Sequence, residues 1–370
     1  MTPPLKGIKV IELARVLAGP WMGQVLADLG AEVIKIESPK GDETRQWGPP
    51  FITKDDTEFS AYFLSCNRGK SSLVADFNDA QDLARIKALI SQADIVIENF
   101  KVGGLVKYGL DYAALSQSHP ALIYASVTGF GQTGPYAHRA GYDYLIQGMG
   151  GIMDLTGEPE GQPQKTGVAF ADIFTGLYGV IGIQAALRHR DMTGEGQQID
   201  LALYDTLVGV LANQAQNYLT SGKAPTRLGN AHPNICPYAV FPAQDGYFIL
   251  AIGNDDQFAR FCKGFDCPHL STDKRFATNQ SRVAHREALT ALITAITSSM
   301  AVADILALCE AHIVPAGPVN NVEQALRDPH IAHRKMLITL DGIEQVRTPL
   351  TFSKSTLALS KGAPKLGEDT

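Results

Sequence analysis

The stretch that decides the fold class of this 370-residue chain is residues 7–37, GIKVIELARVLAGPWMGQVLADLGAEVIKIE. The apolar run Ile8–Leu13 predicts a strand, and Ala31–Glu37 predicts a second one. Between them, Pro20–Leu29 predicts a helix with a proline suitably at its start, where the missing N–H needs no partner. Two short strands joined through a helix indicate a parallel βαβ unit with a right-handed crossover.

The same alternation continues through the first half of the chain. Further strands are expected at Ser72–Phe77, Asp94–Phe100 and Ala121–Val127, and helices near 79–92 and 104–118. This pattern predicts an α/β fold with a doubly wound, Rossmann-like sheet. From residue 141 to 219 the pattern is mostly helical, apart from a strand-like stretch at 196–203.

The second half predicts a smaller α+β unit after a polar, Gly/Pro-rich stretch at Ser221–Pro237, which has the composition of a linker or loop. The expected elements are a strand at Tyr247–Ile252 and helices at Asp255–Lys263, Arg282–Ser299, Ala303–His312 and Val322–His333.

The charge balance excludes a general nucleic-acid binder. The chain has 38 acidic and 32 basic residues, a net charge of −6 and a pI near 5.9, so no basic surplus attracts a phosphate backbone. The 22-residue stretch Thr166–Leu187 is apolar but contains an aspartate and four glycines, which favours a buried helix of a soluble protein over a membrane span.

The cysteines predict reduced thiols. Their number, five, is odd, and they follow no regular framework, which suits a cytoplasmic protein. Cys262, Cys267 and His269 match no familiar zinc spacing, so no metal is expected. The amino-terminal residues lack the apolar core of a secretory signal.

The loops after the predicted strands indicate where a ligand binds. Glycines and small residues recur there, with Lys40, Lys101, Lys107 and Arg139 nearby. This combination suits a phosphate-bearing ligand, although each loop taken alone also fits ordinary turns and surface lysines. The G-x-G-x-x-G, P-loop and G-x-S-x-G motifs are absent, which disfavours an NAD dehydrogenase, an ATPase and an α/β-hydrolase.

Asp172 is the acidic residue with the most unusual surroundings. It is the only side chain between Lys165 and Arg188 expected to be charged at neutral pH. Two interpretations stay open on the residues alone: it caps the helix that follows, or it is a poorly hydrated carboxylate that acts as a nucleophile or base. Four other aspartates have more polar or ordinary surroundings: Asp143, Asp154, Asp200 and Asp205.

Several motifs, taken together, resemble the class III coenzyme A transferases (CaiB/BaiF type), a family that includes α-methylacyl-CoA racemase as a relative. The motifs are the opening segment quoted above, GDETR at 41–45, IENF at 97–100, SVTGFGQTGP at 126–135, YDYLIQGMGGIM at 142–153, FADIFTGLY at 170–178 and TGEGQQIDLALYD at 193–205. The resemblance covers nearly the whole chain.

The resemblance implies a large coenzyme A-binding domain built from residues 1–220 and 325–370, a linker or loop at 221–237 and a small domain at 238–324. It also implies an interlocked homodimer. The implied function is transfer of coenzyme A from an acyl-CoA donor to a small carboxylic acid, with a dicarboxylic acid favoured; the substrate would be acyl-CoA, and no metal would be needed.

The resemblance places the family's catalytic aspartate at Asp172, which would form aspartyl anhydride and aspartyl-CoA thioester intermediates. The implied coenzyme A contacts are Val16, Leu17, Ala18, Ala75, Asp76, Phe77, Asn78, Asn99, Phe100, Lys101, Lys107, Gly141, Tyr142 and Asp143. Phe77 and Phe100 would stack near adenine or serve as core aromatics, and Lys107 would pair with a phosphate or lie in solvent.

Some positions depart from the family pattern. Ser38 stands where some relatives have arginine, so Lys40 or Arg45 would bind phosphate instead. Leu17 replaces a glutamine of the formyl-CoA transferases, and Gly229–Pro237 replaces their glycine-rich lid, as a lid or a linker. Tyr142 replaces the histidine that a racemase needs, which favours transferase over α-proton racemase or epimerase. A non-catalytic acyl-CoA-binding relative is the third alternative.

Overall fold

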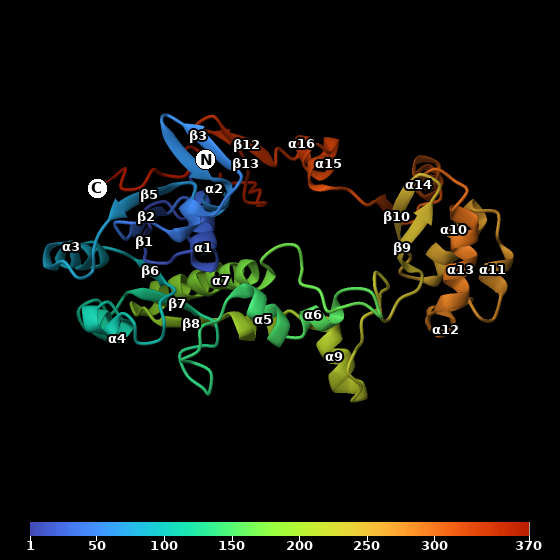
Figure 1. Cartoon of the computed structure of the whole chain (residues 1–370), viewed down its shortest axis with the longest axis horizontal. Helices are drawn as coiled ribbons and strands as arrows, with labels where there is room; N and C mark the ends of the chain where they lie inside the picture. Colours follow the sequence, from blue (N-terminus) through green and yellow to red (C-terminus); the bar gives the residue numbers. More distant parts are fainter. Residues whose placement is uncertain (370) are drawn as a thin grey trace. The chain divides into compact units, whose positions relative to one another are not determined.

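The computed structural model describes residues 1–369, and its central feature is a sheet of six parallel strands in the order β5-β2-β1-β6-β7-β8 (Figure 1). These strands are β1 (Lys9–Glu12), β2 (Glu32–Glu37), β5 (Lys70–Val74), β6 (Ile95–Glu98), β7 (Ile123–Thr128) and β8 (Gln198–Ala202). The predicted α/β class is confirmed. The order reverses between β1 and β6, which is where doubly wound sheets form a ligand crevice.

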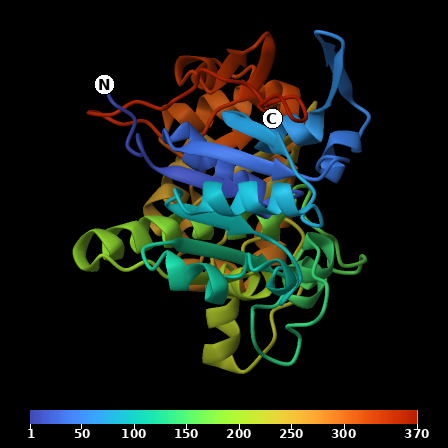
Figure 2. The ribbon, with the colours of Figure 1, turned by 90° about the vertical axis from the view of Figure 1, so that its left-hand side faces the viewer.

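Helices cover both faces of this sheet. One face carries α1 (Ala18–Asp28) and α7 (Phe170–Thr193), and the other carries α3 (Ala80–Ile90) and α4 (Tyr112–Ser118). Figure 2 shows α3, in cyan, lying over the strands. Successive residues of a strand point to opposite faces, so in β6 Ile95 and Ile97 pack on the α1 side while Val96 packs on the other. A strand buried on both faces must be apolar almost throughout.

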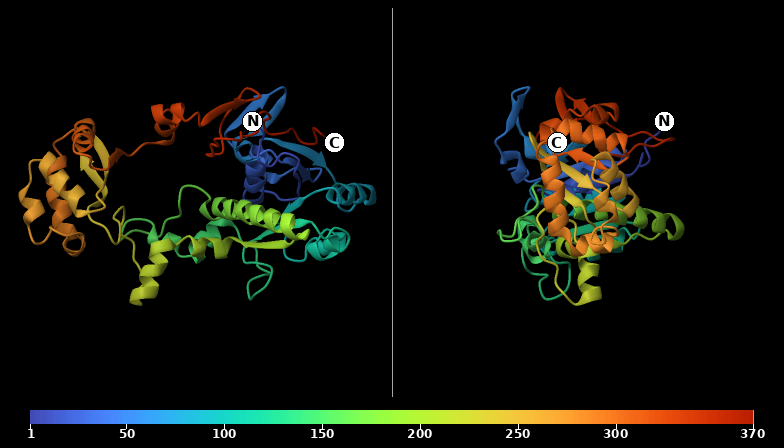
Figure 3. Two further views of the ribbon diagram at one scale, coloured as in Figure 1. Left: turned by 180° about the vertical axis from the view of Figure 1, so that it is seen from behind. Right: turned by 90° about the vertical axis from the view of Figure 1, so that its right-hand side faces the viewer.

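Helix α7 is the long apolar helix expected in the core. Figure 3 (left) shows it as the long yellow-green helix beside α1, and its buried residues include Gly176, Gly179 and Ile183. By length and composition α7 is also able to cross a membrane, and α13 (Arg286–Thr297) with α14 (Val302–Ala311) passes the same test as a pair bent by 110°. The packing of α7 against α1 and the sheet is that of a core helix.

The rest of the large unit is made of short elements around the sheet. These are η1 (Glu43–Gln46), the hairpin of β3 (Phe51–Lys54) and β4 (Thr57–Ser60), α2 (Ala61–Cys66), η2 (Val106–Tyr108), α5 (Asp143–Met149), α8 (Leu203–Gly209), α9 (Ala212–Ser221), α16 (Pro329–His333) and the hairpin of β12 (Leu337–Leu340) and β13 (Ile343–Val346). The short helix α6 (Ile152–Leu155) begins at the last residue before the boundary, and its other residues belong to the smaller unit.

The carboxyl-terminal segment returns to the large unit and covers the edge strand β5. The Asp369 N–H donates to the Ser72 carbonyl at 3.0 Å, and the Ser72 N–H donates to Asp369 Oδ2 at 2.9 Å. The Arg68 guanidinium, buried against Asp28, also donates to the Val346 carbonyl at 3.0 Å. These bonds pair backbone groups that an exposed strand edge would leave open.

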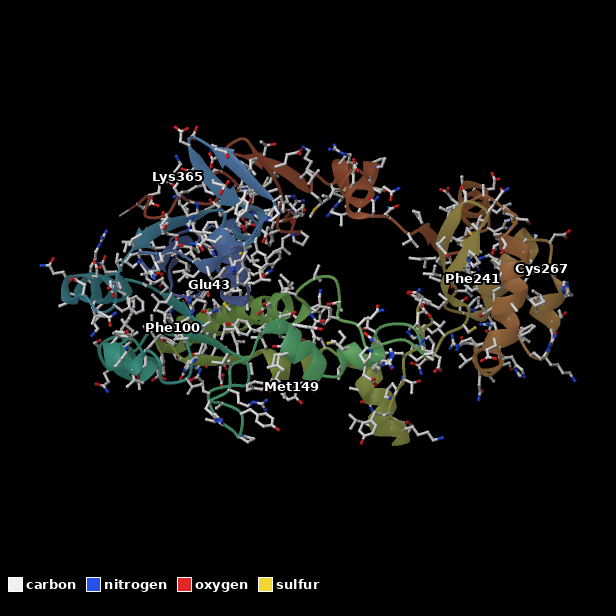
Figure 4. All side chains as sticks on the ribbon, viewed as in Figure 1. Glu43, Phe100, Met149, Phe241, Cys267 and Lys365 are labelled. Carbon is white, nitrogen blue, oxygen red and sulfur yellow. The ribbon has the colours of Figure 1, made fainter. Side chains whose placement is uncertain are left out.

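The smaller unit has its own core. A three-stranded antiparallel sheet of β9 (Tyr238–Ala243), β10 (Gly246–Ala251) and β11 (Ala316–Pro318) packs against α10 (Asp255–Gly264), α11 (His269–Thr272), α12 (Asn279–Ala284), α13 and α14, and α15 (Val322–Leu326) follows. Phe241 and Cys267, labelled in Figure 4, belong to this core. All five cysteines are buried free thiols.

The boundaries differ from the prediction in places. Residues 153–164, assigned from the sequence to the large domain, pack with residues 224–328 in the smaller unit. The single helix expected at Val322–His333 is two helices, α15 and α16, because the residue before Pro329 is disfavoured in helical conformation. The helix expected near 104–118 is interrupted at Gly109, which has a φ of 62° and ends η2.

Candidate functional site

A cavity of about 510 Å³ lies at the carboxyl ends of β1, β6 and β7, where the strand order reverses. The loops after these strands form it together with the first turn of α7. Nine of the coenzyme A contacts expected from the sequence line it with Asp172, namely Val16, Leu17, Ala18, Asn99, Phe100, Lys101, Gly141, Tyr142 and Asp143. The site is therefore where the topology alone predicts a ligand.

Asp172 is the third residue of α7 and lines the cavity. The residue as a whole is partly buried, but its carboxyl group is enclosed by protein. This burial, and secondly the negative charge of Asp143, raises the pKa of Asp172 to about 7. A carboxylate that is poorly hydrated and has a raised pKa is a better base and nucleophile than an exposed one.

Asp143, rather than Asp172, caps the amino-terminus of α7. Its Oδ1 accepts the N–H of Ala171 at 2.8 Å and the N–H of Asp172 at 3.3 Å. Ala169, the residue before the helix, has no side chain that does this. Of the two interpretations of Asp172, helix capping is wrong, and its carboxyl remains available for chemistry. Asp143, which was expected to contact coenzyme A, lines the cavity, and its carboxylate is also hydrogen-bonded to the start of α7.

Gln147 completes the support of this helix start. It is fully buried, and its Nε2 donates to Asp143 Oδ2 at 2.7 Å. Its Oε1 accepts the N–H of Thr166 at 2.9 Å, which fixes the segment entering α7. Sequence reasoning missed Gln147. The signal that was present is its spacing of four residues from Asp143 on α5, which places the two side chains on one helix face.

Asn99 joins two of the loops that form the cavity. Its Oδ1 accepts the Arg15 N–H at 2.9 Å, and its Nδ2 donates to the Arg15 carbonyl at 2.6 Å. These paired bonds tie the loop after β6 to the loop after β1. We conclude that the side chain of Asn99 positions the cavity wall.

Five expected contacts do not line this cavity: Ala75, Asp76, Phe77, Asn78 and Lys107. They lie next to its Phe100 wall instead. The rings of Phe77 and Phe100 stack with centroids 5.9 Å apart, and Phe77 meets Tyr108 edge-on at 5.4 Å. The Lys107 ammonium lies 4.5 Å from the Tyr108 ring centre, and Asn78 accepts a hydrogen bond from the Tyr108 hydroxyl at 3.3 Å.

Two backbones approach so closely at the cavity that only glycine fits. A Cβ on Gly141 would lie 2.5 Å from the Cα of Gly129, and the reverse substitution gives the same clash. The loop after β7 and the segment before α5 can therefore approach this closely only because neither glycine has a side chain. This contact explains why the residue before Tyr142 is glycine.

Three cationic side chains line the cavity: Arg15, Lys101 and Arg139. Arg139 lies over the Tyr136 ring at 4.7 Å, and Arg15 pairs with Glu43 at 3.0 Å. Glu43 and Phe100, labelled in Figure 4, mark two sides of this site. The sequence indicated Lys101 and Arg139 as cations suited to a phosphate-bearing ligand, but gave Arg15 no role.

Arg45, one of the two cations expected to bind phosphate, is engaged by an acidic partner inside the protein. Its guanidinium makes two hydrogen bonds to Glu37, at 2.7 and 2.8 Å, and stacks on the Phe63 ring at 3.8 Å. Most of the donors of Arg45 are thus already used within the protein, and Arg45 does not line the cavity. Lys40, the alternative, is exposed and lies outside the cavity lining.

The other candidates are placed away from the cavity. Asp154, Asp200 and Asp205 do not line it, and Asp154 pairs with Arg227 at 2.8 Å. Within residues 1–369 no group of three His, Cys, Asp or Glu side chains is arranged to hold a metal ion.

The segment Gly229–Pro237 is held firmly by the smaller unit, contrary to the linker interpretation. Arg286 donates to the His232 carbonyl at 2.7 Å, and the buried Arg282 donates to the Cys236 carbonyl at 2.6 Å. Asn279 donates to the Asn234 carbonyl at 2.9 Å. A segment with these bonds is a fixed loop of the smaller unit.

Comparisons with known proteins show the family to which this chain belongs. A family model described as CoA-transferase family III matches residues 5–370. The succinate–glutarate CoA-transferase of Agrobacterium fabrum is 54% identical over 374 residues, covering 99% of this chain and 94% of that protein. The succinyl-CoA:glutarate CoA-transferase of Mus musculus is 38% identical, covering 99% and 85%. The crystal structure of a CAIB/BAIF family protein from Brucella suis matches with a TM-score of 0.91 and 57% identity, covering 100% and 98%.

Proposed function

Because this chain belongs to CoA-transferase family III, we propose that it transfers coenzyme A between two dicarboxylic acids, of which succinate and glutarate are the first candidates. The observation that carries the proposal is the enclosed carboxyl of Asp172 in a cavity whose wall also has three cations. Succinate and glutarate are the candidate acids because both appear in the names of these two relatives.

The proposed reaction uses Asp172 as a covalent nucleophile. One carboxylate oxygen of Asp172 attacks the thioester carbonyl of the donor, which gives a mixed anhydride and releases the coenzyme A thiolate. The thiolate then attacks the aspartyl carbonyl, which gives an aspartyl-CoA thioester and frees the donor acid with one oxygen from Asp172. Each step replaces one activated acyl bond by another, so no step needs water.

The acceptor acid completes the cycle by the same two steps in reverse order. Its carboxylate attacks the aspartyl-CoA thioester, releases the thiolate and forms a second mixed anhydride. The thiolate attacks the acceptor carbonyl, so the new acyl-CoA leaves and Asp172 regains a carboxylate that contains one acceptor oxygen. The chain is thereby restored at every turnover.

The rest of the cavity suits these substrates. Arg15, Lys101 and Arg139 offer charge partners for the phosphates of coenzyme A and for the distal carboxylate of a dicarboxylic acid. Asp143 holds the backbone on which Asp172 is mounted, and thereby keeps its carboxyl at one place in the cavity.

The reaction should become faster with rising pH up to about pH 7. Asp172 attacks only in its carboxylate form, and its pKa is raised to about 7 by burial and by Asp143, so acidification protonates the nucleophile. We expect kcat/KM for the acyl-CoA to fall about tenfold per pH unit below this value and to be level above it. Initial rates across the neutral range check this. A profile that stays level well below pH 7 contradicts it.

The substrate proposal is tested with purified protein, succinyl-CoA and a panel of acids. We expect glutaryl-CoA to form faster than the thioesters of monocarboxylic acids of the same chain length, with all products measured by chromatography. Turnover with monocarboxylic acids only would overturn the dicarboxylate assignment. Deuterium entering the α-carbon of an acyl-CoA without any acceptor acid would instead favour the racemase alternative.

The proposal includes a homodimer and a cytoplasmic location. Three large apolar residues, Leu177, Tyr178 and Ile181, are exposed on α7, and Ile181 is 62% exposed. A second copy of the chain would cover this face, as the family resemblance implies, through an interlocked arrangement. Light scattering coupled to size-exclusion chromatography should give the mass of two chains.

The cytoplasmic location is supported by the cysteines. The five buried free thiols fit a reducing compartment.

A further inference from the structure

Val16 has a backbone conformation that its residue type disfavours. Its φ is 71°, in the left-handed region, where the Cβ of a β-branched residue crowds the neighbouring carbonyl oxygens. It directly follows Arg15 in the loop after β1 and lines the cavity with Leu17 and Ala18. Strained backbone of this kind persists only where surrounding contacts hold it.

The N–H of Val16 is held by Asp42, and the carbonyl of Val16 accepts from the Cys66 thiol at 3.6 Å. The Val16 N–H donates to the Asp42 carboxylate, at 3.2 Å from Oδ2 and 3.4 Å from Oδ1. The same carboxylate accepts the N–H and the hydroxyl of Thr44 at 3.0 and 2.8 Å. Asp42 is 1% exposed, so water does not compete for these bonds.

Buried charges behind Asp42 fix it in turn. The Lys35 ammonium lies 2.9 Å from Asp42 Oδ2 and donates to the Ala14 carbonyl at 2.8 Å, so it binds the strand end just before Val16 as well. Burial alone would raise the pKa of Asp42, but the Lys35 charge and the Thr44 N–H lower it, and the carboxylate stays ionised. Glu37 accepts the N–H of Asp42 at 2.9 Å.

The support continues to the far end of the chain. Arg45 holds Glu37 through its two hydrogen bonds, and Arg45 Nη1 donates to the Pro364 carbonyl at 3.2 Å. The carboxyl-terminal segment thus supports Arg45, which supports Val16 indirectly through Glu37 and Asp42.

We propose that Asp42 is a positioning residue that clamps Val16 in its left-handed conformation and thereby sets the Val16–Ala18 wall of the acyl-CoA cavity. This inference rests on the proposed function, because it assumes that coenzyme A occupies the cavity at Asp172. It concerns the shape of the wall and assigns Asp42 no contact with substrate.

The test is a double-mutant cycle that uses glycine at position 16. Glycine adopts a positive φ without strain, so the clamp is needed only when Val16 is present. With Val16 in place, we expect Asp42→Asn to weaken coenzyme A binding about 10–100-fold, as measured by isothermal titration calorimetry. In the Val16→Gly background the same change should cost less than about threefold. Val16→Ala is the matched control, because alanine keeps its Cβ and Asp42→Asn should remain costly there.

A second variant keeps the test valid if Asp42→Asn does not fold. Thr44→Val removes one hydrogen bond to Asp42 and leaves its charge in place, and we expect a loss of binding of several-fold that Val16→Gly again suppresses. Circular dichroism of each variant shows whether it is folded. A purely structural role predicts lowered thermal stability in both backgrounds with unchanged binding, and that result overturns the clamp.

The two proposals fail in different ways. If the unmodified protein does not bind coenzyme A, the proposed site fails and the clamp fails with it. If the unmodified protein binds coenzyme A, and Asp42→Asn and Thr44→Val bind it equally well, only the clamp is overturned.

Discussion

The Asp172→Asn protein is expected to transfer coenzyme A at least about 10³-fold more slowly than the unmodified protein, while binding coenzyme A with similar affinity. Asparagine has the same shape, and the N–H groups that Asp143 caps belong to the backbone, so α7 should begin as before. What is lost is the carboxylate that forms the anhydride. Steady-state rates and a separate binding titration measure the two quantities, and Asp205→Asn, on α8 outside the cavity, is the control.

The same variant should be more stable than the unmodified protein at alkaline pH. The folded pKa of Asp172, about 7, lies above its ordinary value of 3.8, so its stabilising contribution is full below pH 3.8 and is lost as the pH rises through 7. Above that, the unmodified protein carries the cost of a buried charge, and asparagine removes a penalty of about 2–4 kcal/mol. Denaturant unfolding at about pH 8 measures this. A fall in the free energy of unfolding would mean that Asp172 has a structural role.

Glu12→Gln is expected to lower the free energy of unfolding by about 3–5 kcal/mol. Glu12, Lys35 and Lys70 are all fully buried beneath α1. The Lys70 ammonium hydrogen-bonds Glu12 Oε1 at 2.9 Å and lies 2.8 Å from Oε2, while Lys35 lies 3.1 Å from Oε1. Glutamine fits the space but leaves the Lys70 charge without its acidic partner. A Cβ on Gly23 would lie 1.8 Å from Glu12 Oε2, so the helix leaves no room for rearrangement.

A matched change shows whether burial is the cause. Glu43→Gln removes the same charge from the exposed pair of Arg15 and Glu43, and should cost no more than about 1 kcal/mol. Adding Lys70→Met to Glu12→Gln should recover part of the lost stability, because the unpaired charge disappears. Denaturant unfolding of each variant measures the loss in the free energy of unfolding. Equal losses for Glu12→Gln and Glu43→Gln would contradict the account.

The architecture of the sheet could be predicted because its signal is local. Apolar runs such as Ile8–Leu13 and Ala31–Glu37 must be strands buried on both faces, and the helix between them fixes their direction. The strand predicted at Ser72–Phe77 is β5, which runs from Lys70 to Val74. Its start was missed because a lysine is expected at the surface, and only the structure shows that Lys70 pairs with the buried Glu12. The β3–β4 hairpin was missed because its mostly exposed residues show little apolar alternation.

The place of the site could be predicted from the ends of the strands, and Asp172 because this residue is unusual by itself. Asp172 stands alone in an apolar stretch, and the structure places it in the cavity. The hydrogen bonds of Asp143 and Arg45 could not be predicted because both depend on partners distant in sequence, the N–H of Ala171 and the carboxylate of Glu37. Spacing carries no information on such contacts. The strain at Val16 is likewise invisible until the backbone is known.

The route of oxygen through Asp172 tests the central claim most directly. The protein is allowed to turn over with succinyl-CoA and glutarate labelled with ¹⁸O in its carboxylates, and its peptides are then analysed by mass spectrometry. The account predicts ¹⁸O in the side chain of Asp172, because each cycle leaves one acceptor oxygen there, and no label in Asp143 or Asp205. Rapid formation of glutaryl-CoA with an unlabelled Asp172 would contradict it.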